Sequence, residues 1–115
     1  MTMKKRKLSN TYISLKENVP FVGKFTGITT LTDFNGNELL NKQSGNPMQV
    51  AQFETAYKSD EGQDVDGVWL DGGLKGAFSL CKVKPGMVLE ITKKGKKPFG
   101  DFEVNDYSVF ELVEE

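Results

Sequence analysis

The chain has 115 residues, of which 37% are hydrophobic and 27% are charged, and its formal net charge is −1. This length allows one domain with its own core, and no apolar run approaches the roughly 20 residues that cross a bilayer. The chain has no histidine and one cysteine, Cys81, which excludes the usual zinc sites, an internal disulfide and Ser-His-Asp or Cys-His catalysis. We therefore expect a cytoplasmic protein that is not an enzyme and that uses no cofactor, metal or membrane.

Residues 1–18 are polar and show no clear periodicity. We predict that they form a partly ordered basic arm in front of one domain over residues 19–115. The cations of the arm could bind phosphates or only increase solubility, and no apolar segment follows them as in a secretory signal. These cations are Lys4, Lys5, Arg6 and Lys7.

The first strand is predicted over residues 19–31, where apolar and small residues occupy alternate positions. Gly23 and Gly27 lie on one face of this strand and predict a sharp bend, at which another backbone comes close. Asn35-Gly36 follows and suits the positive φ angles of a tight hairpin turn.

Four further strands and one helix follow along the chain. The strands are expected over residues 48–57, 65–70, 87–94 and 107–113, and the helix over residues 74–83. In the third strand, either Val68 and Leu70 or Val65 and Trp69 face the core.

The helix and the last strand both supply predicted core residues. Leu74, Phe78 and Cys81 recur at helical spacing and share one face of the helix. In the last strand, Phe110 and Leu112 are expected to face the core.

The resulting order, β-β-β-α-β-β, predicts an all-β fold with one short helix. This order is typical of the OB-fold, a five-stranded Greek-key barrel. An SH3-like barrel or a fragment of a sandwich is the alternative. The edges of such a sheet could also pair two copies in a homodimer.

The segment from residue 93 to residue 102 contains four lysines within five residues, followed by two phenylalanines. Single-stranded nucleic acid offers phosphates to cations and base faces to aromatic rings. OB-folds bind oligonucleotides on strands two and three and on the loops after strands one and four, and this segment, with residues 95–106, is the second of these loops. The alternative is a solvated turn beside two phenylalanines that plug the barrel end. The candidate residues are Lys93, Lys94, Lys96, Lys97, Phe99 and Phe102.

Five more candidates extend the expected groove. Phe34 lies at the turn after the first strand, Tyr57 and Trp69 lie on the second and third strands, and Tyr107 follows the lysine segment. Lys24 could lengthen the cationic track, although a single lysine is more often solvated surface. Each aromatic residue could instead belong to the core.

An acidic stretch over residues 60–66 raises the question of a metal site. Its spacing does not match the alternate ligands, the glycine at position six and the final glutamate of an EF-hand loop. A surface turn is also a poor support for a two-metal centre, which needs carboxylates at fixed separations. We predict no metal site here.

Three stretches carry a resemblance to a known family: the bent strand over residues 21–27, the helix over residues 74–85 with Gly86 behind it, and residues 88–96 leading to residues 107–112. In this layout the chain resembles the small OB-fold single-stranded DNA-binding proteins of bacteriophages, in particular those of phages that infect lactococci. The resemblance implies coating of single-stranded DNA without strong sequence preference during phage replication or recombination in the host cytoplasm. It also implies contact with a recombinase or polymerase.

Two alternatives stay open at this point: an OB-fold protein-interaction module of a phage replication or virion assembly, and an RNA-binding protein. The chain departs from bacterial-type relatives at its C-terminus. Residues 111–115 are too short for the long acidic tail through which those relatives recruit partners.

Overall fold

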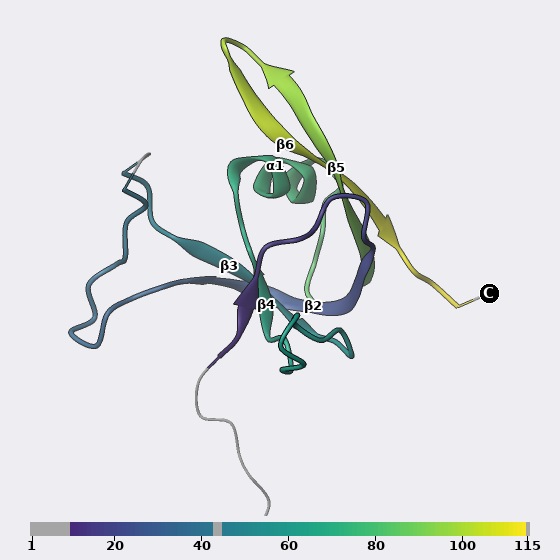
Figure 1. The fold of residues 1–115 in the computed structure, drawn as a ribbon, viewed down its shortest axis with the longest axis horizontal. Coiled ribbons are helices and arrows are strands. Elements are labelled where there is room, and N and C mark those ends of the chain that lie inside the picture. Colours follow the sequence, from purple (N-terminus) through teal and green to yellow (C-terminus); the bar gives the residue numbers. More distant parts are fainter. Residues whose placement is uncertain (1–9, 43–44, 115) are drawn as a thin grey trace, which may run out of the picture.

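The computed structural model describes residues 10–42 and 45–114. Within these residues, one sheet and one helix make up the fold (Figure 1). The elements are β1 (Tyr12–Ile13), β2 (Phe21–Thr30), β3 (Gln49–Glu54), β4 (Gly67–Trp69), α1 (Gly72–Leu80), β5 (Val88–Phe99) and β6 (Phe102–Glu111). None of the described residues form a helix that is long and apolar enough to cross a membrane.

The strands lie in the order β1-β4-β3-β2-β5-β6, and all neighbours are antiparallel except β1 and β4. Strands β2, β3 and β4 are consecutive, and β5 returns after α1 to pair with β2, which is a Greek-key arrangement. The predicted β class with one short helix is confirmed. The structure does not contain the predicted five-stranded barrel: its six-stranded sheet is not closed into a barrel, and β1 pairs with the edge of β4.

Residues 10–18, the described part of the predicted arm, pack against the sheet and the core. β1 pairs with β4, and the side chain of Leu15 is buried in the core. Farther along, the backbone N–H of Asn18 donates to the carbonyl of Lys93 in β5 at 2.8 Å. The apolar alternation here is only a few residues long, which is too short to indicate a strand. The rest of the predicted arm, residues 1–9, lies outside the described residues.

The bend predicted for the first strand is confirmed. The pairing of β2 with β3 shifts register between Phe25 and Gly27, and Gly27 has a φ of +154°. A Cβ atom added to Gly23 would lie 3.0 Å from the Cβ of Thr55. The bulge turns β2, so that its first half pairs with β5 and its second half with β3.

Aromatic rings from distant elements meet in the core. The ring centroids of Phe21 and Phe53 lie 5.0 Å apart, and Phe25 lies 5.3 Å from Phe78 of α1. These edge contacts tie the helix to the sheet. Cys81, which was expected on the buried face, is exposed because α1 ends at Leu80.

The last strand corrects two sequence predictions. Phe110 and Leu112 were expected in the core, but their side chains are 61% and 43% exposed. Val109, opposite the buried Ile91, faces the core instead. Since neighbouring residues of a strand point to opposite faces, this shift by one residue places Phe110 on the outer face.

Candidate nucleic-acid interface

The predicted loop over residues 95–106 is a two-stranded hairpin. Strands β5 and β6 continue their pairing to the opposed pair Phe99 and Phe102. One register shift interrupts the ladder between Lys93 and Gly95, where Gly95 has a φ of +110°. The hairpin projects beyond α1 from the body of the protein (Figure 1). Its side chains are therefore held on paired strands and not on a loose connection.

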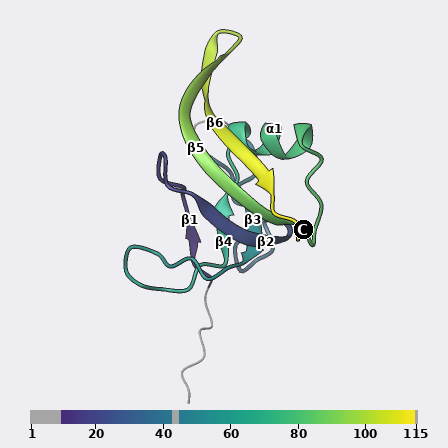
Figure 2. The ribbon, with the colours of Figure 1, turned by 90° about the vertical axis from the view of Figure 1, so that its right-hand side faces the viewer.

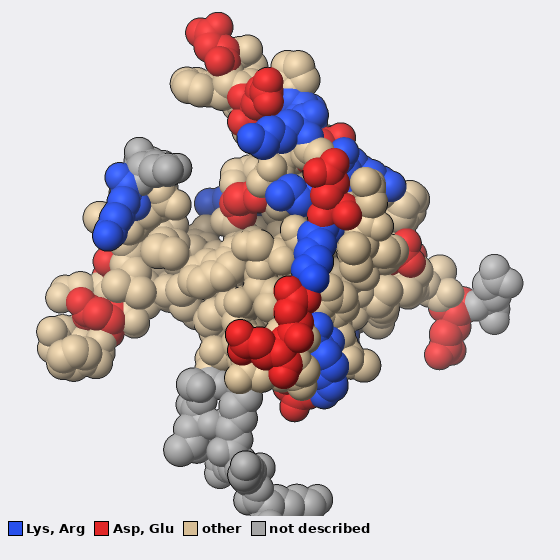
Figure 3. All heavy atoms as spheres, in the orientation of Figure 1, with Lys and Arg blue, Asp and Glu red and all other residues tan. Residues whose placement is uncertain are grey.

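All four lysines of the segment lie on β5, within this hairpin. Lys94, Lys96 and Lys97 are exposed, and Lys93 is half-buried. Of these four lysines, only Lys97 forms an ion pair with a described residue, Asp106, at 3.4 Å. Acidic side chains lie beside lysines on the hairpin (Figure 3), so its positive charge is local and partly offset. The ammonium groups of Lys93, Lys94 and Lys96 form no ion pair with a described residue and can attract anionic groups.

Phe99 and Phe102 are 68% and 75% exposed at the end of the hairpin. The alternative that they plug the end of a barrel is therefore wrong. The two rings do not contribute to the hydrophobic core. Exposed aromatic rings at a projecting tip are typical of a binding surface.

A groove with a volume of about 1010 Å³ lies between the hairpin, the start of α1 and the 41–48 segment. Trp69 of β4 and Phe102 of the hairpin both line it, although they are far apart in the sequence. The ammonium of Lys75 on α1 donates to the side-chain carbonyl of Gln49 at 3.2 Å, and both residues also line the groove. The groove thus combines two aromatic rings, one cation, amide groups and the carboxylates of Asp71 and Glu103.

The structure draws core residues from both alternatives, because Val65, just before β4, is buried as well as Val68. Val68 is buried and Leu70 packs against the core, so Trp69 points to the opposite face and is only partly buried. The edge of the Trp69 ring contacts Tyr12, with centroids 5.8 Å apart. This contact fixes the indole at the wall of the groove.

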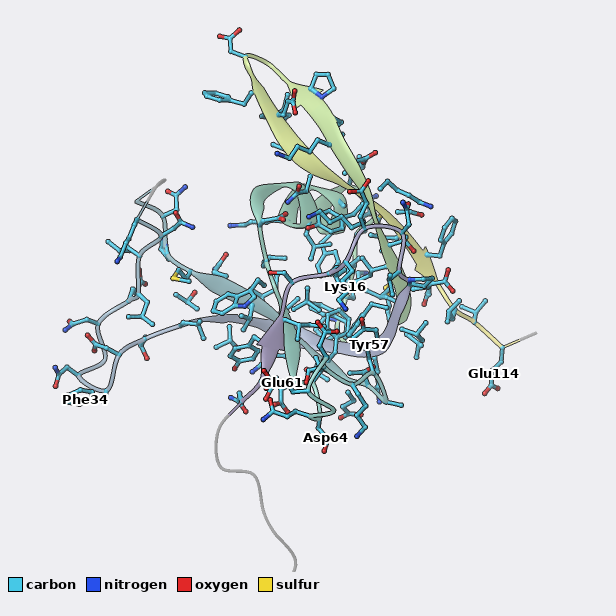
Figure 4. All side chains as sticks on the ribbon, viewed as in Figure 1. Lys16, Phe34, Tyr57, Glu61, Asp64 and Glu114 are labelled. Atoms are coloured by element: carbon cyan, nitrogen blue, oxygen red, sulfur yellow. The ribbon has the colours of Figure 1, made fainter. Side chains whose placement is uncertain are left out.

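Of the predicted site residues, only Trp69 and Phe102 line this groove. The four hairpin lysines, Phe99 and Tyr107 lie on β5 and β6 outside it, and three further residues lie elsewhere in the fold. Tyr57 follows β3 and its ring packs on Phe21 at 5.2 Å, which makes it part of the core margin. Lys24 is exposed on the outer face of β2, beside Val88. Phe34 is 99% exposed at the tip of the other projecting segment, well away from Tyr57 (Figure 4).

Tyr107 has a structural role. Its hydroxyl donates to Asp71 Oδ2 at 2.6 Å, and the side-chain amide of Asn105 donates to the same oxygen at 2.8 Å. The other oxygen of Asp71 accepts from the N–H of Leu74 and caps α1. This network fixes the hairpin to the helix, and burial followed by the hydrogen bond to Asp71 raises the pKa of Tyr107.

Gly73 brings α1 and β6 together at the same place. A Cβ atom added to Gly73 would lie 2.0 Å from the carbonyl oxygen of Asn105, so only glycine allows the two backbones to approach this closely. Two features of the sequence could have indicated this contact between α1 and β6: Asp71, which is a preferred N-cap residue, and the glycine pair that follows it.

We expect Tyr107→Phe to lower the free energy of unfolding by about 1.5 kcal/mol at pH 7, because it removes a hydrogen bond to a carboxylate. The folded-state pKa of Tyr107 lies above that of the unfolded chain. Its contribution to stability is therefore complete below pH ~10 and is lost as the pH rises further. Urea unfolding of both proteins at pH 7 and pH ~11 should show the difference shrinking. A difference independent of pH would contradict the hydroxyl's role.

In the acidic stretch over residues 60–66, two carboxylates form ion pairs with lysines of this chain. Lys16 pairs with Asp60 and Lys58 pairs with Asp64, beside Glu61 (Figure 4). The hydrogen bond to Asp60 and the charge of that carboxylate raise the pKa of Lys16. Across residues 10–42 and 45–114, no three histidine, cysteine, aspartate or glutamate side chains are grouped as a metal would require.

Sequence reasoning missed Gln49 and Lys75, which line the groove. Each is an ordinary polar residue on a strand or helix, and only the packing of α1 beside β3 brings them together. No signal in the sequence could have identified them.

The fold and the groove define a small Greek-key β protein with a lysine-bearing hairpin and a groove lined by aromatic rings. A scan against protein-family models and searches of curated proteins and of solved structures found no match to this chain. Its function is therefore argued from its own residues.

Proposed function

We propose that this protein binds single-stranded DNA without strong sequence preference. The observation that carries the proposal is the groove lined by Trp69 and Phe102, because Phe102 belongs to the same hairpin as the four lysines. Bases stack on aromatic rings whatever their sequence, and ammonium groups attract the phosphates between them. The net charge of −1 does not oppose this, since screening limits exposed charges to about 10 Å at ordinary salt.

We further propose that the fold is an open variant of the OB-fold. Strands β2 to β6, with α1 between β4 and β5, follow the β-β-β-α-β-β order of that fold. OB-folds bind oligonucleotides on strands two and three and on the loops after strands one and four. The corresponding parts here are β3 and β4, the 31–48 segment and the hairpin tip, and residues from all three line the groove.

The resemblance to bacteriophage single-stranded DNA-binding proteins extends this proposal to a biological role. The protein would coat single strands during phage replication or recombination in the host cytoplasm, and a recombinase or polymerase would be its protein partner.

One observation favours a second function, a protein-interaction module. Phe34 is fully exposed at the tip of the 31–48 segment, away from the groove, and Leu40 on the same segment is 55% exposed. Apolar side chains at a projecting tip are typical of protein contacts. If the protein is such a module, Phe34→Ala should abolish binding of the protein partner, and the wild-type protein should not bind oligonucleotides.

A titration with oligo-dT at low salt tests the proposed function. We expect quenching of the fluorescence of Trp69, the only tryptophan of the chain, at micromolar protein. Affinity should fall as salt increases, with a slope of about −0.7 for each phosphate neutralised. Competition with oligo-U distinguishes RNA binding, because the 2′-OH is the feature that differs. Absence of binding, or binding that ignores salt, would refute single-stranded DNA binding.

A further inference from the structure

The tip of the 31–48 segment contains the only asparagine of the chain that is followed by glycine, Asn35-Gly36. The segment projects from the body of the protein in Figure 1 and lies behind the sheet in the view of Figure 2. Both residues are exposed, and a Cβ atom added to Gly36 would meet nothing within 4 Å. Neither residue lines the groove that contains Trp69, so the proposed DNA binding does not use them.

The side chain of Asn35 and the backbone of Gly36 can react with each other. When the Gly36 amide nitrogen gives up its proton to hydroxide, it can attack the side-chain carbonyl carbon of Asn35. A bond forms between Gly36 N and Asn35 Cγ, the bond between Cγ and Nδ2 breaks, and Nδ2 leaves as ammonia with a proton taken from water. Water then opens the five-membered imide at either of its carbonyls, which gives aspartate or isoaspartate. The ring closes readily because the chain already holds both reacting groups together.

The glycine distinguishes this position from the other asparagines of the segment. Gly36 has no Cβ atom that could shield its nitrogen or restrict the backbone as the ring forms. Asn37 is exposed in the same tip but precedes Glu38, and Asn41 precedes a lysine. The side chains of those following residues crowd the nitrogen that would attack. Among these thermolabile residues, the chemistry therefore favours Asn35.

The folded turn restrains the reaction. The N–H of Gly36 donates to the carbonyl of Asp33 at 3.0 Å, and Asp33 Oδ1 accepts from the N–H groups of Asn35 and Asn37 at 2.9 and 3.0 Å. The attacking nitrogen must leave its hydrogen bond, so the turn has to open first. The ring of Phe34 is 99% exposed and does not fasten the tip to the body. Local opening of such a tip costs little free energy.

We propose that Asn35 is a site of covalent self-modification, at which Gly36 converts the asparagine to aspartate and isoaspartate and Asp33 limits the rate. The modification is independent of DNA binding. It adds a carboxylate beside the Phe34 ring and, in the isoaspartate product, inserts the side-chain methylene into the backbone. A charge at this place opposes the burial of Phe34 against an apolar surface, so the modification acts against protein contacts at the tip.

Incubation of the full chain at about pH 8 and about 37 °C, followed by trypsin digestion, tests the proposal. Cleavage after Lys24 and Lys42 releases one peptide with Asn35, Asn37 and Asn41, so tandem mass spectrometry compares the three asparagines under the same conditions. We expect a mass gain of about 1 Da at Asn35, at least about 10-fold faster than at Asn37. The rate should rise with pH, because the deprotonated nitrogen attacks. Conversion no faster at Asn35 than at Asn37 would overturn the proposal.

Two variants test the roles of the individual residues. Asn35→Gln keeps an exposed side-chain amide but needs a larger ring, so the rapid mass gain of the peptide should disappear. Asp33→Ala removes the carboxylate that holds the turn closed and should speed the conversion of Asn35 about 3-fold. Circular dichroism verifies that both variants are folded. A rapid mass gain that persists in Asn35→Gln, or an unchanged rate in Asp33→Ala, would refute the assigned chemistry.

Discussion

Reversing two charges of the hairpin, Lys94→Glu with Lys96→Glu, should weaken oligo-dT binding about 100-fold at ~50 mM salt. Both side chains are exposed on β5 and form no ion pair within the described residues, so their charges are available to phosphates. The change removes two attractions and adds two repulsions along the backbone of the strand. The salt slope should shrink by about 1.4, the loss expected for two phosphates of a single strand. Fluorescence anisotropy of a labelled oligonucleotide at several salt concentrations measures both quantities.

The matched control for this variant is Lys82→Glu with Lys84→Glu. It changes the net charge by the same amount, but its two exposed lysines follow the end of α1 that is remote from the hairpin. We expect less than a ~3-fold effect, because screening limits charges at that distance. An equal loss of oligo-dT affinity in both variants would mean that only the net charge matters. It would refute the binding of phosphates by the lysines of the hairpin.

Elements with a strong local pattern could be predicted from the sequence. The alternation of β2 and its two glycines indicated the bend, and Leu74 and Phe78 indicated the helix, as the structure confirms. Which residues of β6 face the core could not be predicted in the same way. Phe110 and Val109 are both apolar, and only pairing with β5 decides which of them faces the core.

The candidate site was predictable where chemistry is concentrated in a short segment. Four lysines and two phenylalanines in one segment were recognisable, and the structure places all of them on one exposed hairpin. The roles of single aromatic residues were not recognisable. Tyr107 and Tyr57 have the same side chain as a stacking residue, but a carboxylate at 2.6 Å and a ring at 5.2 Å give them structural roles. Such contacts between distant residues leave no local pattern.

The two aromatic rings of the groove, Trp69 and Phe102, come from different parts of the fold. Their relative position therefore depends on how the hairpin is attached to the helix at Asp71. Trp69 is fixed on β4 by Tyr12, whereas Phe102 sits at the end of a long hairpin. The distance between the two rings depends on the angle at which the hairpin leaves the sheet. The hydrogen bonds that Asp71 accepts from Asn105 and Tyr107 fasten β6 to the start of α1. We therefore infer that Asp71, which itself lines the groove, also preorganises it.

Removing both rings of the groove, with Trp69→Ala and Phe102→Ala combined, should weaken oligo-dT binding by about 3 kcal/mol, or roughly 150-fold. Each ring offers a stacking surface for a base, and stacking is typically worth about 1–3 kcal/mol for each base. The salt slope should not change, because no cation is removed, and this separates the result from that of the lysine variant. Anisotropy of a labelled oligonucleotide is the measurement, since the tryptophan signal is lost.

Phe110→Ala is the control for the Phe102 variant, because it removes another exposed phenylalanine, 61% against 75% exposed, from the outer face. With a short oligonucleotide that occupies one groove, it should bind as the wild-type protein does. Phe102→Ala alone isolates stacking from folding, since its ring is 75% exposed, whereas Trp69→Ala also removes the contact with Tyr12. If Phe102→Ala binds oligo-dT with wild-type affinity while the lysine variant does not, the hairpin attracts phosphates without stacking bases, and the groove is not the path of the strand.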